Sequence, residues 1–479
     1  MPRSRLRSFS CALALLVVVF ALYGRALGHG LVSDDFLLFA QVENGPLAAL
    51  AYHGSYHWYP LGQLVLWLQQ ALAGDSGAGH HTITLGLFWL LGLATVGLGR
   101  RLGFSEPVAW AGGLLLLTSV LPFEVPLWAI GSLYSVSALL AIGAFRAYLR
   151  LVESPGFAHQ AGFLALYAAA FLTHEQALGV PLAAVAWSVW VEKERSLVRL
   201  GLRFLPAVGL VLVYIGLKFA LTDGTALLPG LELAWVKSLG RTVFHSLRVL
   251  LPVFPSDFVW ALLRPPAGPW ALAFVAVVVG LIWRRLDGRE RFLTLWGLGQ
   301  VALMTVAIGL ASRHYALPLI PIGLLWASLL ARASRERRGL FAVLVALVAL
   351  GGALQVPAKV VAWGRASQAA ERILADVERA AVERPVARYL LTIDLPDGLP
   401  QGEAEPAYIF RLGFEDAVRG RLPGRFLDFE RRVTEPRKSW VEPYGRPISA
   451  VERAALAENP EVLVLYADGP EAGLRLALP

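Results

Sequence analysis

The stretch SFSCALALLVVVFALYGR (residues 8–25) decides the fold class of this 479-residue chain. Its first 17 residues, between Arg7 and Arg25, carry no charge, and a short arginine cluster precedes them. An uncharged apolar run of this length approaches the roughly 20 residues with which a helix crosses a bilayer. The residues ALG at 26–28 also resemble a signal-peptidase site, but the many apolar runs that follow favour an uncleaved first span.

Composition extends this conclusion to the whole chain. Hydrophobic residues make up 56% of the sequence and charged residues only 16%, whereas a soluble domain carries about 25% charged residues. The mean hydropathy is +0.58. These values exclude soluble α/β and fibrous proteins and indicate a polytopic membrane protein. The single cysteine, Cys11, excludes disulfides and cysteine-based metal sites.

The net charge of +8 does not indicate nucleic-acid binding, because the basic residues form short clusters between apolar runs. The clusters occur at every second boundary between runs, as the positive-inside rule predicts. The pattern predicts about eleven transmembrane helices in the cell (inner or plasma) membrane, with a cytoplasmic N-terminus. The apolar runs fall roughly at 8–24, 82–99, 107–123, 125–145, 160–173, 176–191, 204–217, 265–283, 292–312, 315–331 and 339–358.

These features predict a polytopic α-helical membrane region over residues 1–356 and a small extracytoplasmic α/β domain over residues 357–479. In the tail, the strand-like runs RYLLTIDL and EVLVLYAD alternate with the helix-like SQAAERILADVERAAVE. Two long outside loops are expected at about 28–81 and 222–264. Each contains a segment typical of an interfacial helix, WYPLGQLVLWLQQALAG in the first and WVKSLGRTVFHSLRVLLPVF in the second.

Two adjacent carboxylates, Asp34 and Asp35, lie in LVSDDFLLFA (31–40), shortly after the first apolar run. Charged side chains at membrane depth are costly and are usually retained for function. One alternative is that they cap the helix-like segment that follows. A cap needs only one carboxylate, however, and two adjacent ones repel each other. The pair therefore also indicates a cation site or a proton-transfer site.

Further charged residues lie outside, close to the ends of predicted spans. Glu124 lies in LPFEVPLWAIGSLYSV, Glu175 in FLTHEQALGVPL and Arg313 in SRHYALPLIPIG. Different hairpins hold them at one depth, so they can converge with the Asp pair. Arg313 is either an interface anchor or a residue that grips a lipid-linked phosphate. The outside histidines have spacings that match no closed metal site.

In this order, the motifs resemble those of the GT-C superfamily of membrane glycosyltransferases. Within it, the likeness is to the protein O-mannosyltransferases and their tetratricopeptide-linked relatives, and it covers residues 1 to about 335. In those proteins an acidic pair opens the first outside loop and an interfacial helix with a YRPL-like motif follows. Here SDDF and WYPLG occupy those places, and Glu124, Glu175 and Arg313 occupy the charged positions of three later motifs.

The chain also departs from the family pattern. The Arg of the YRPL motif is missing after Tyr59, and His174 replaces a Lys. Ser132 and Tyr134 stand where the family has an Arg and an Asp. The tail carries no tetratricopeptide pattern.

The resemblance implies inverting transfer of a sugar from a polyprenyl-phosphate donor to a protein or glycan acceptor at the outer face of the lipid bilayer. It implies that Asp34 takes the acceptor proton and that Asp35 orients the acceptor or holds a cation. The motifs leave open whether a divalent cation takes part. The implied substrate-binding residues are Glu124, Glu175, His174 and Tyr59, and the implied donor-phosphate residues are Arg313, Arg241 and Lys237.

Two other interpretations stay open. A polytopic transporter or lipid-handling protein would also use outside carboxylates, for protons or ions. Transporters usually place their charges mid-span, whereas these lie at span ends. A non-catalytic GT-C relative is the third interpretation, since several motif residues are missing.

Overall fold

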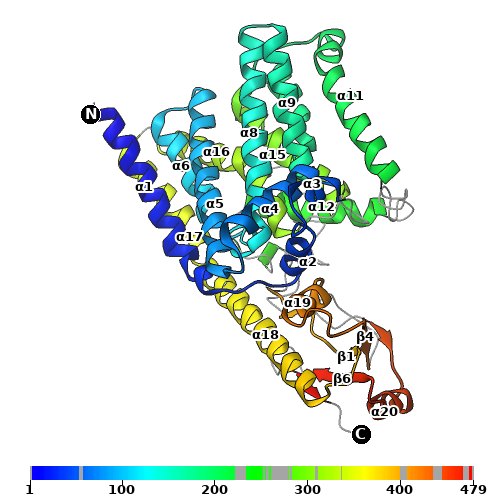
Figure 1. Ribbon diagram of the computed structural model, residues 1–479. Helices are drawn as coiled ribbons and strands as arrows, with labels where there is room; N and C mark the ends of the chain where they lie inside the picture. The colour runs from blue at the N-terminus through cyan, green and yellow to red at the C-terminus, as the bar shows by residue number, and fades with distance from the viewer. Residues whose placement is uncertain are drawn as a thin grey trace.

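The fold is mostly helical, with a small β-sheet near the C-terminus, as the computed structural model in Figure 1 shows. Most of the predicted run at 265–283 and residues 222–233 of the predicted loop at 222–264 lie outside the described residues, as do the side chains of residues 234–239. The structure describes residues 3–52, 58–221, 234–251, 254, 258–259, 261, 280, 283–307, 311–335, 337–399, 407–434, 445–467 and 474–476.

Apolar helices form a bundle that makes up most of the molecule. In Figure 1, α5, α6, α8, α9, α15 and α16 run through its middle, while α1 and α11 stand at its flanks. The bundle helices are α1 (Arg3–Tyr23), α5 (Gly77–Arg101), α6 (Glu106–Thr118), α8 (Ser132–Glu153), α9 (Phe157–Thr173), α10 (Val180–Trp190), α11 (Leu197–Leu221), α15 (Gly288–Ala307), α16 (Ala316–Ala333) and α17 (Arg338–Ala353).

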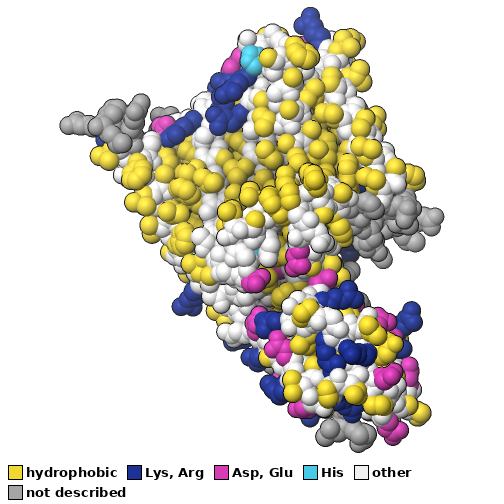
Figure 2. Space-filling model, viewed as in Figure 1, with side chains coloured by type: hydrophobic (Ala, Val, Ile, Leu, Met, Phe, Trp, Pro, Cys, Tyr) yellow, Lys and Arg dark blue, Asp and Glu magenta, His cyan; other side chains and the backbone are white. Residues whose placement is uncertain are grey.

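Among the described residues, six helical segments are long and apolar enough to cross a membrane. They are Leu6–Gly28, Gly77–Arg101, Ala129–Glu153, Leu197–Leu221, Ser312–Ala333 and Arg338–Glu383. Other predicted runs do form helices, but several are short: α6 has 13 residues and α10 has 11. The predicted count of about eleven spans is therefore not confirmed. The apolar helices indicate a multi-pass membrane protein, and hydrophobic side chains cover most of the bundle in Figure 2.

Glycines set how closely the central helices approach. A Cβ on Gly113 of α6 would lie 2.8 Å from the carbonyl oxygen of Gly92 on α5, and a Cβ on Gly323 of α16 would lie 2.8 Å from that of Gly112. Lipid tails are as apolar as Leu side chains, so helices in a bilayer gain stability from close packing of small residues rather than from burial alone. Helix α6 is thus wedged between α5 and α16 by backbone contact.

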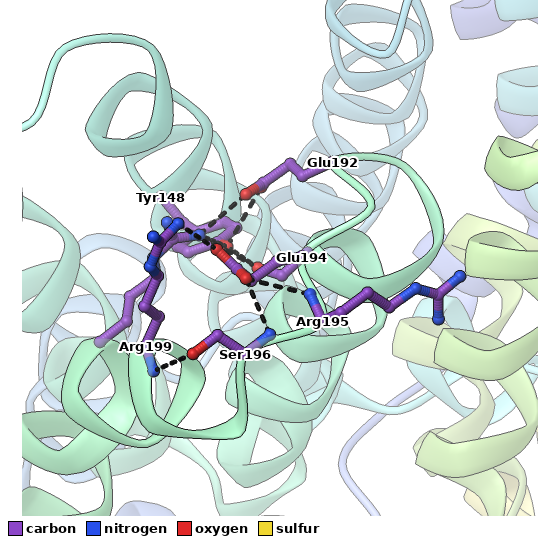
Figure 3. Close-up of polar contacts among 8 residues, drawn as sticks. Tyr148, Glu192, Glu194, Arg195, Ser196 and Arg199 are labelled. Carbon is purple, nitrogen blue, oxygen red and sulfur yellow. Dashed lines mark hydrogen bonds and ion pairs between the residues drawn. The ribbon is translucent and has the colours of Figure 1, made fainter.

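A polar network joins the basic ends of three helices (Figure 3). Arg203 of α11 donates to Glu192 (2.8 Å) and to the hydroxyl of Tyr148 on α8 (3.2 Å). Ser196 caps α11, since its hydroxyl accepts the backbone N–H of Arg199 at 3.3 Å. These residues come from the C-terminal half of α8, the α10–α11 connection and the first turns of α11. The polar groups at these arginine-rich helix ends thus form their hydrogen bonds with one another, at one end of the bundle.

Short helices and 3₁₀ turns connect the bundle helices at the other end. Helix α4 (Pro60–Ala73) and helix α12 (Ala234–Leu250) are the two amphipathic helices that the sequence predicted. The remaining elements are η1 (Gly24–Gly28), α2 (Asp34–Ala40), α3 (Pro46–Ala51), α7 (Glu124–Leu127), η2 (Ala129–Gly131), η3 (Glu175–Gly179) and η4 (Ser312–Tyr315). In Figure 1, α2, α3 and α4 lie at the end of the bundle that faces the sheet.

The C-terminal unit, residues 356–476, consists of a long helix and a five-stranded sheet in the order β5-β4-β1-β6-β7. Both predicted strands are present, as β1 (Tyr389–Ile393) and β6 (Val462–Ala467), and they pair in parallel. The sheet residues of β1 are buried after the first. The other elements are α18 (Val356–Glu383), β2 (Gly398–Leu399), β3 (Ala407–Tyr408), α19 (Phe414–Arg421), β4 (Asp428–Val433), β5 (Arg446–Pro447), α20 (Ala450–Glu458) and β7 (Leu474–Leu476).

The C-terminal unit docks onto the loop that carries the Asp pair, residues 29–35, here called the Asp loop. The backbone N–H of Ser33 donates to the carbonyl of Ile409 at 2.8 Å, and the N–H of Gly30 donates to the Ser367 hydroxyl at 2.6 Å. Gly413 has φ +77°, and a Cβ there would lie 2.4 Å from the Ser33 carbonyl oxygen. Only glycine adopts that conformation at such close approach without cost.

We predict that Gly413→Ala weakens this docking. A left-handed conformation costs a residue with a side chain about 1–2 kcal/mol, and the clash with Ser33 adds to it. The measurement is the thermal unfolding midpoint in detergent, together with the rate of proteolysis of the C-terminal unit. Gly420→Ala is the matched control, because a Cβ on Gly420, in the same helix, meets nothing within 4 Å. Equal behaviour of the two variants would contradict the prediction.

Candidate functional site

The charged residues predicted at the ends of different hairpins do converge. Asp34 begins α2, Glu124 begins α7, Glu175 begins η3 and Arg313 lies in η4. Each of these elements is a short helix or turn that reverses the chain between longer helices. The reversal is what places polar side chains at the end of an otherwise apolar bundle, next to α19 and the sheet (Figure 1).

Glu124 and Arg313 form a buried ion pair. The Arg313 Nη1 lies 3.0 Å from Glu124 Oε2, and the Arg313 backbone N–H donates to the same oxygen at 3.1 Å. The side chains are 3% and 15% exposed, so little water screens the pair. The guanidinium also stacks on the ring of Trp128, 5.1 Å from its centroid. Buried charges are tolerated when they are paired and hydrogen-bonded, and Arg313 is both.

The rest of the guanidinium faces a group of polar side chains. It interacts electrostatically with Tyr134, with Tyr408 of the C-terminal unit and with Asp34. These three side chains come from α8, β3 and α2. We refer to Asp34, Glu124, Trp128, Tyr134, Arg313 and Tyr408 together as the Arg313 site.

The two adjacent aspartates have different surroundings. Asp35 is fully buried; its Oδ2 accepts the N–H of Val32 at 2.9 Å and its Oδ1 accepts the N–H of Ile130 at 3.1 Å. Its carboxyl group thereby ties the Asp loop to η2. Asp34 is only half-buried and accepts the Ser33 hydroxyl at 2.8 Å. Asp35 thus has a structural role, whereas Asp34 is the aspartate of the pair that belongs to the Arg313 site.

Burial raises the pKa of the Asp35 carboxyl well above its usual range. The two backbone N–H donors oppose that shift, while the negative charge of Asp34 adds to it. Asp34 and Asp35 do not form the helix cap that was the alternative interpretation of the pair. Helix α2 has Ser33 at its N-cap without a side-chain cap hydrogen bond, and Ser33 has the strained φ of 49°.

Tyr59 and His174, both predicted to bind substrate, lie in one aromatic stack beside the Arg313 site. The ring of His174 lies 4.5 Å from that of Tyr134, 5.7 Å from that of His314 and 6.3 Å from that of Tyr59, measured between centroids. His174 Nδ1 accepts the N–H of Gln176 at 3.2 Å, which leaves the ring proton on Nε2. Burial raises the pKa of the Tyr59 hydroxyl, and Tyr134, Asp34 and Glu175 raise it further.

Glu175 is buried and paired with Lys218, and the Tyr214 hydroxyl donates to it at 2.9 Å. Lys218 follows the apolar run at 204–217, where a lysine side chain often snorkels to the membrane surface, but this side chain is 12% exposed and forms the pair with Glu175. Tyr214 also donates to the carbonyl of Trp58 at 3.0 Å. The two residues connect helix α11 to the end of the bundle through Glu175 and the start of α4.

The two predicted helper cations are not part of the described site. Arg241 is exposed on α12, and the side chain of Lys237 lies outside the described residues. His245 follows Arg241 on α12, and its Nδ1 forms a hydrogen bond with the Tyr315 hydroxyl. Arg248 is buried with its guanidinium 5.3 Å from the centroid of the Tyr315 ring. Arg248 is thus a buried cation of α12 that contacts Tyr315, and Tyr315 follows Arg313 by two residues in the chain.

A metal ion does not fit the described part of this site. No group of three or more His, Cys, Asp or Glu side chains within the described residues is arranged to hold one. Both carboxylate oxygens of Asp35 face backbone N–H donors instead. The expectation that Asp35 holds a cation is therefore not supported by its geometry, and we derive no step through a metal.

Several residues of the site were missed by the sequence interpretation, namely Trp128, Tyr408, Tyr214, Lys218, His314 and Arg248. Tyr134 was noted only as a departure from the family pattern. A signal was present for two of them. Lys218 is a lone cation next to an uncharged run, and Trp128 follows Glu124 by four residues. Tyr408 had no local signal, because its role depends on how the C-terminal unit docks.

We predict that Asp35→Ala lowers the thermal unfolding midpoint, whereas Asp34→Ala changes it little. The first substitution leaves two buried N–H groups without an acceptor, at a cost of about 1–3 kcal/mol each. The second removes a half-buried carboxylate whose hydrogen bond comes from an adjacent hydroxyl. Thermal unfolding of the purified variants in one detergent measures both. A larger loss for Asp34→Ala would reverse the structural assignment of the pair.

No protein-family model matches the sequence, and no curated protein matches it. Solved structures do match. The crystal structure of ArnT from Cupriavidus metallidurans bound to undecaprenyl phosphate aligns over 96% of this chain and 93% of its own, with TM-score 0.48 and 14% identity. The Archaeoglobus fulgidus oligosaccharyltransferase in the apo form aligns over 80% of this chain and 62% of its own, with TM-score 0.46 and 12% identity.

The arabinosyltransferase EmbB from Mycobacterium smegmatis aligns over 75% of this chain and 41% of its own, with TM-score 0.34 and 16% identity. At these identities no residue role is transferred from any of the three proteins. The three solved structures are GT-C superfamily glycosyltransferases.

Proposed function

We propose that this protein is an inverting glycosyltransferase that moves a sugar from a polyprenyl-phosphate donor to an acceptor hydroxyl at the outer face of the membrane. One observation carries the proposal. Asp34, a half-buried carboxylate, lies close enough to Arg313 to interact with its charge, and another carboxylate already holds this buried guanidinium in place. A base and an oriented cation at the end of an apolar bundle are what this reaction needs.

The reaction requires a base on one side of the anomeric carbon and a cation on the other. The acceptor oxygen attacks C1, the bond between C1 and the phosphate oxygen breaks, and the polyprenyl phosphate leaves with the bonding electron pair. The acceptor hydroxyl proton passes to Asp34. General-base catalysis of this kind contributes about 10² to 10⁴-fold to the rate.

Asp34 is the better base because the other three carboxylates of this region are engaged by stronger partners. Glu124 holds Arg313, Glu175 is paired with Lys218, and Asp35 accepts two backbone N–H groups. Asp34 accepts one hydrogen bond, from the Ser33 hydroxyl. Partial exposure gives an acceptor access to it, whereas Asp35 is fully buried.

Arg313 supplies the cation for the departing phosphate. Its Nη1 and backbone N–H are fixed by Glu124, and Trp128 stacks on its guanidinium. A guanidinium held in one orientation loses no further side-chain entropy when phosphate binds, and its remaining donors match phosphate oxygens. A preoriented donor in a water-poor site is worth more than the same donor in water.

The aromatic stack supports binding of a sugar ring. Tyr59, Tyr134, His174 and His314 present flat faces and polar tips between Asp34 and Glu175. We assign Tyr59 and His174 to this sugar-binding or acceptor-binding wall. Glu175 shapes the wall through Tyr214 and Lys218. The apolar bundle keeps the lipid-linked donor in the bilayer beside the site, which raises its effective concentration.

The direct test is incubation of the purified protein with a panel of polyprenyl-phosphate sugars, with sugar release or transfer as the readout. Turnover of one donor supports the proposal. Donor binding without turnover by any acceptor would support a non-catalytic relative instead. Proton-coupled uptake by reconstituted vesicles, with no turnover, would support a transporter.

We predict that Asp34→Asn lowers the transfer rate about 10² to 10⁴-fold while the affinity for the donor lipid is unchanged. The amide keeps the shape of the side chain but cannot take the proton. The measurement is kcat for transfer, alongside binding of the donor. Asp75→Asn is the matched control, because Asp75 is an exposed carboxylate on the connection between α4 and α5. Wild-type kcat in Asp34→Asn would remove Asp34 as the base.

We predict that Arg313→Lys weakens donor binding about 10-fold to 100-fold, since hydrogen bonds to charged groups are lost while the charge and the pairing to Glu124 are kept. The measurement is the KM for the lipid-linked donor. Arg100→Lys serves as control, because Arg100 pairs with Glu106 at 2.7 Å in an exposed position of the bundle. An unchanged KM in Arg313→Lys would show that the phosphate binds elsewhere.

A further inference from the structure

The C-terminal unit places one of its side chains inside the Arg313 site. Tyr408, the last residue of β3, is 8% exposed, and its hydroxyl interacts with the Arg313 guanidinium. Its ring lies 5.5 Å from that of Trp128, between centroids, so Tyr408 and Arg313 both contact the same indole. A residue from the far end of the chain thus lies against the phosphate-binding cation of the proposed site.

Several contacts of the C-terminal unit fix Tyr408 in this position. The backbone N–H of Ile409, the next residue, donates to the carbonyl of Asp397 at 2.8 Å. Arg431 of β4 donates to the carbonyl of Phe410 at 2.9 Å and to the Asp397 carboxylate at 2.9 Å. The strand end that carries Tyr408 is therefore braced against the sheet.

The same region docks on the bundle through aromatic packing. Trp363 of α18 is almost fully buried, and its ring lies 5.6 Å from that of Trp128 and 6.4 Å from that of Phe123, between centroids. Phe123 and Trp128 flank α7, which carries Glu124. The C-terminal unit thus packs on the turn that holds the buried ion pair.

We propose that Tyr408 is a positioning residue for the donor phosphate: it holds one edge of the Arg313 guanidinium, and its hydroxyl donates a hydrogen bond to a phosphate oxygen. The inference rests on the proposed function and deepens it. It makes the C-terminal unit part of the donor site, in addition to any contact it has with the acceptor.

The chemistry of a tyrosine suits this role. A hydroxyl accepts a hydrogen bond from the guanidinium with a lone pair and keeps one O–H to donate to an anion. Burial raises the pKa of the Tyr408 hydroxyl, and the charge of Glu124 raises it further, against the opposing effects of Arg313 and Arg411. The hydroxyl therefore stays protonated at neutral pH. Phenylalanine would preserve the ring packing on Trp128 and remove only this hydrogen bond.

The arrangement couples docking of the C-terminal unit to donor binding. If the phosphate contacts a residue on each part, then whatever docking contributes to phosphate affinity, phosphate contributes equally to docking. Any variant that loosens the docked state should therefore also weaken donor binding, even where it lies far from the phosphate.

The test is binding of two probes, undecaprenyl phosphate and the uncharged alcohol undecaprenol, to full-length Tyr408→Phe in detergent micelles. We expect binding of the phosphate to weaken about 10-fold to 100-fold, as for loss of a hydrogen bond to a charged group. Binding of the alcohol should not change. The unfolding midpoint without ligand is measured as well. The alcohol needs the same folded site as the phosphate, so unchanged binding of the alcohol separates lost positioning from lost folding.

Tyr466→Phe is the matched control, because Tyr466 lies on β6 of the five-stranded sheet, under the guanidinium of Arg453, whereas β3 pairs with β2 in a separate two-stranded sheet. It should bind both probes as the wild type does. Equal phosphate affinity in Tyr408→Phe and the wild type would overturn the inference and leave the proposed function standing. A wild-type protein that does not prefer the phosphate over the alcohol would overturn the proposed function and the inference with it.

Discussion

The buried ion pair between Glu124 and Arg313 is the interaction on which the site depends. Two charges at the end of an apolar bundle are stable there only because each is paired and hydrogen-bonded. A single carboxylate oxygen accepts both the side chain and the backbone N–H of Arg313. It therefore fixes the start of α16 relative to the turn after α6, and with it the direction in which the guanidinium points. Removing either partner would leave an uncompensated buried charge.

The surrounding aromatic residues follow from this constraint. A guanidinium that is not solvated needs π faces or hydroxyls on its remaining sides, and Trp128, Tyr134 and Tyr408 supply them. Two of these residues flank or begin α8, and the third belongs to the C-terminal unit. The same few contacts thus stabilise the cation, close the end of the bundle and dock the sheet. The bundle end and the C-terminal unit are thus held together because both provide contacts to the charge of Arg313.

Much of this could be predicted from the sequence, because the membrane restricts where charge can lie. Uncharged runs predicted the helices. Charged residues at the ends of these runs, such as Glu124 and Arg313, could lie only at the ends of the helix bundle. Side-chain pairing could not be predicted in the same way. Lys218 ends a run as a snorkelling lysine would, yet it pairs with Glu175 across the bundle end. The periodicity of α12 predicted one polar face. It could not predict that Arg248 is buried while Arg241 is exposed. That depends on where the helix crosses its neighbours.

Tyr408 and Ile409 are adjacent in the chain, and they reach the two halves of the proposed reaction. Tyr408 contacts the cation, while the Ile409 carbonyl accepts the N–H of Ser33, the residue before Asp34. Ser33 has φ 49°, a conformation that persists only where its surroundings enforce it. The distance between base and cation is therefore set partly by one strand end of the C-terminal unit. In the proposed reaction an acceptor hydroxyl and a sugar phosphate must fit within that distance, so the C-terminal unit would shape the reacting geometry itself, and not only the approach to it.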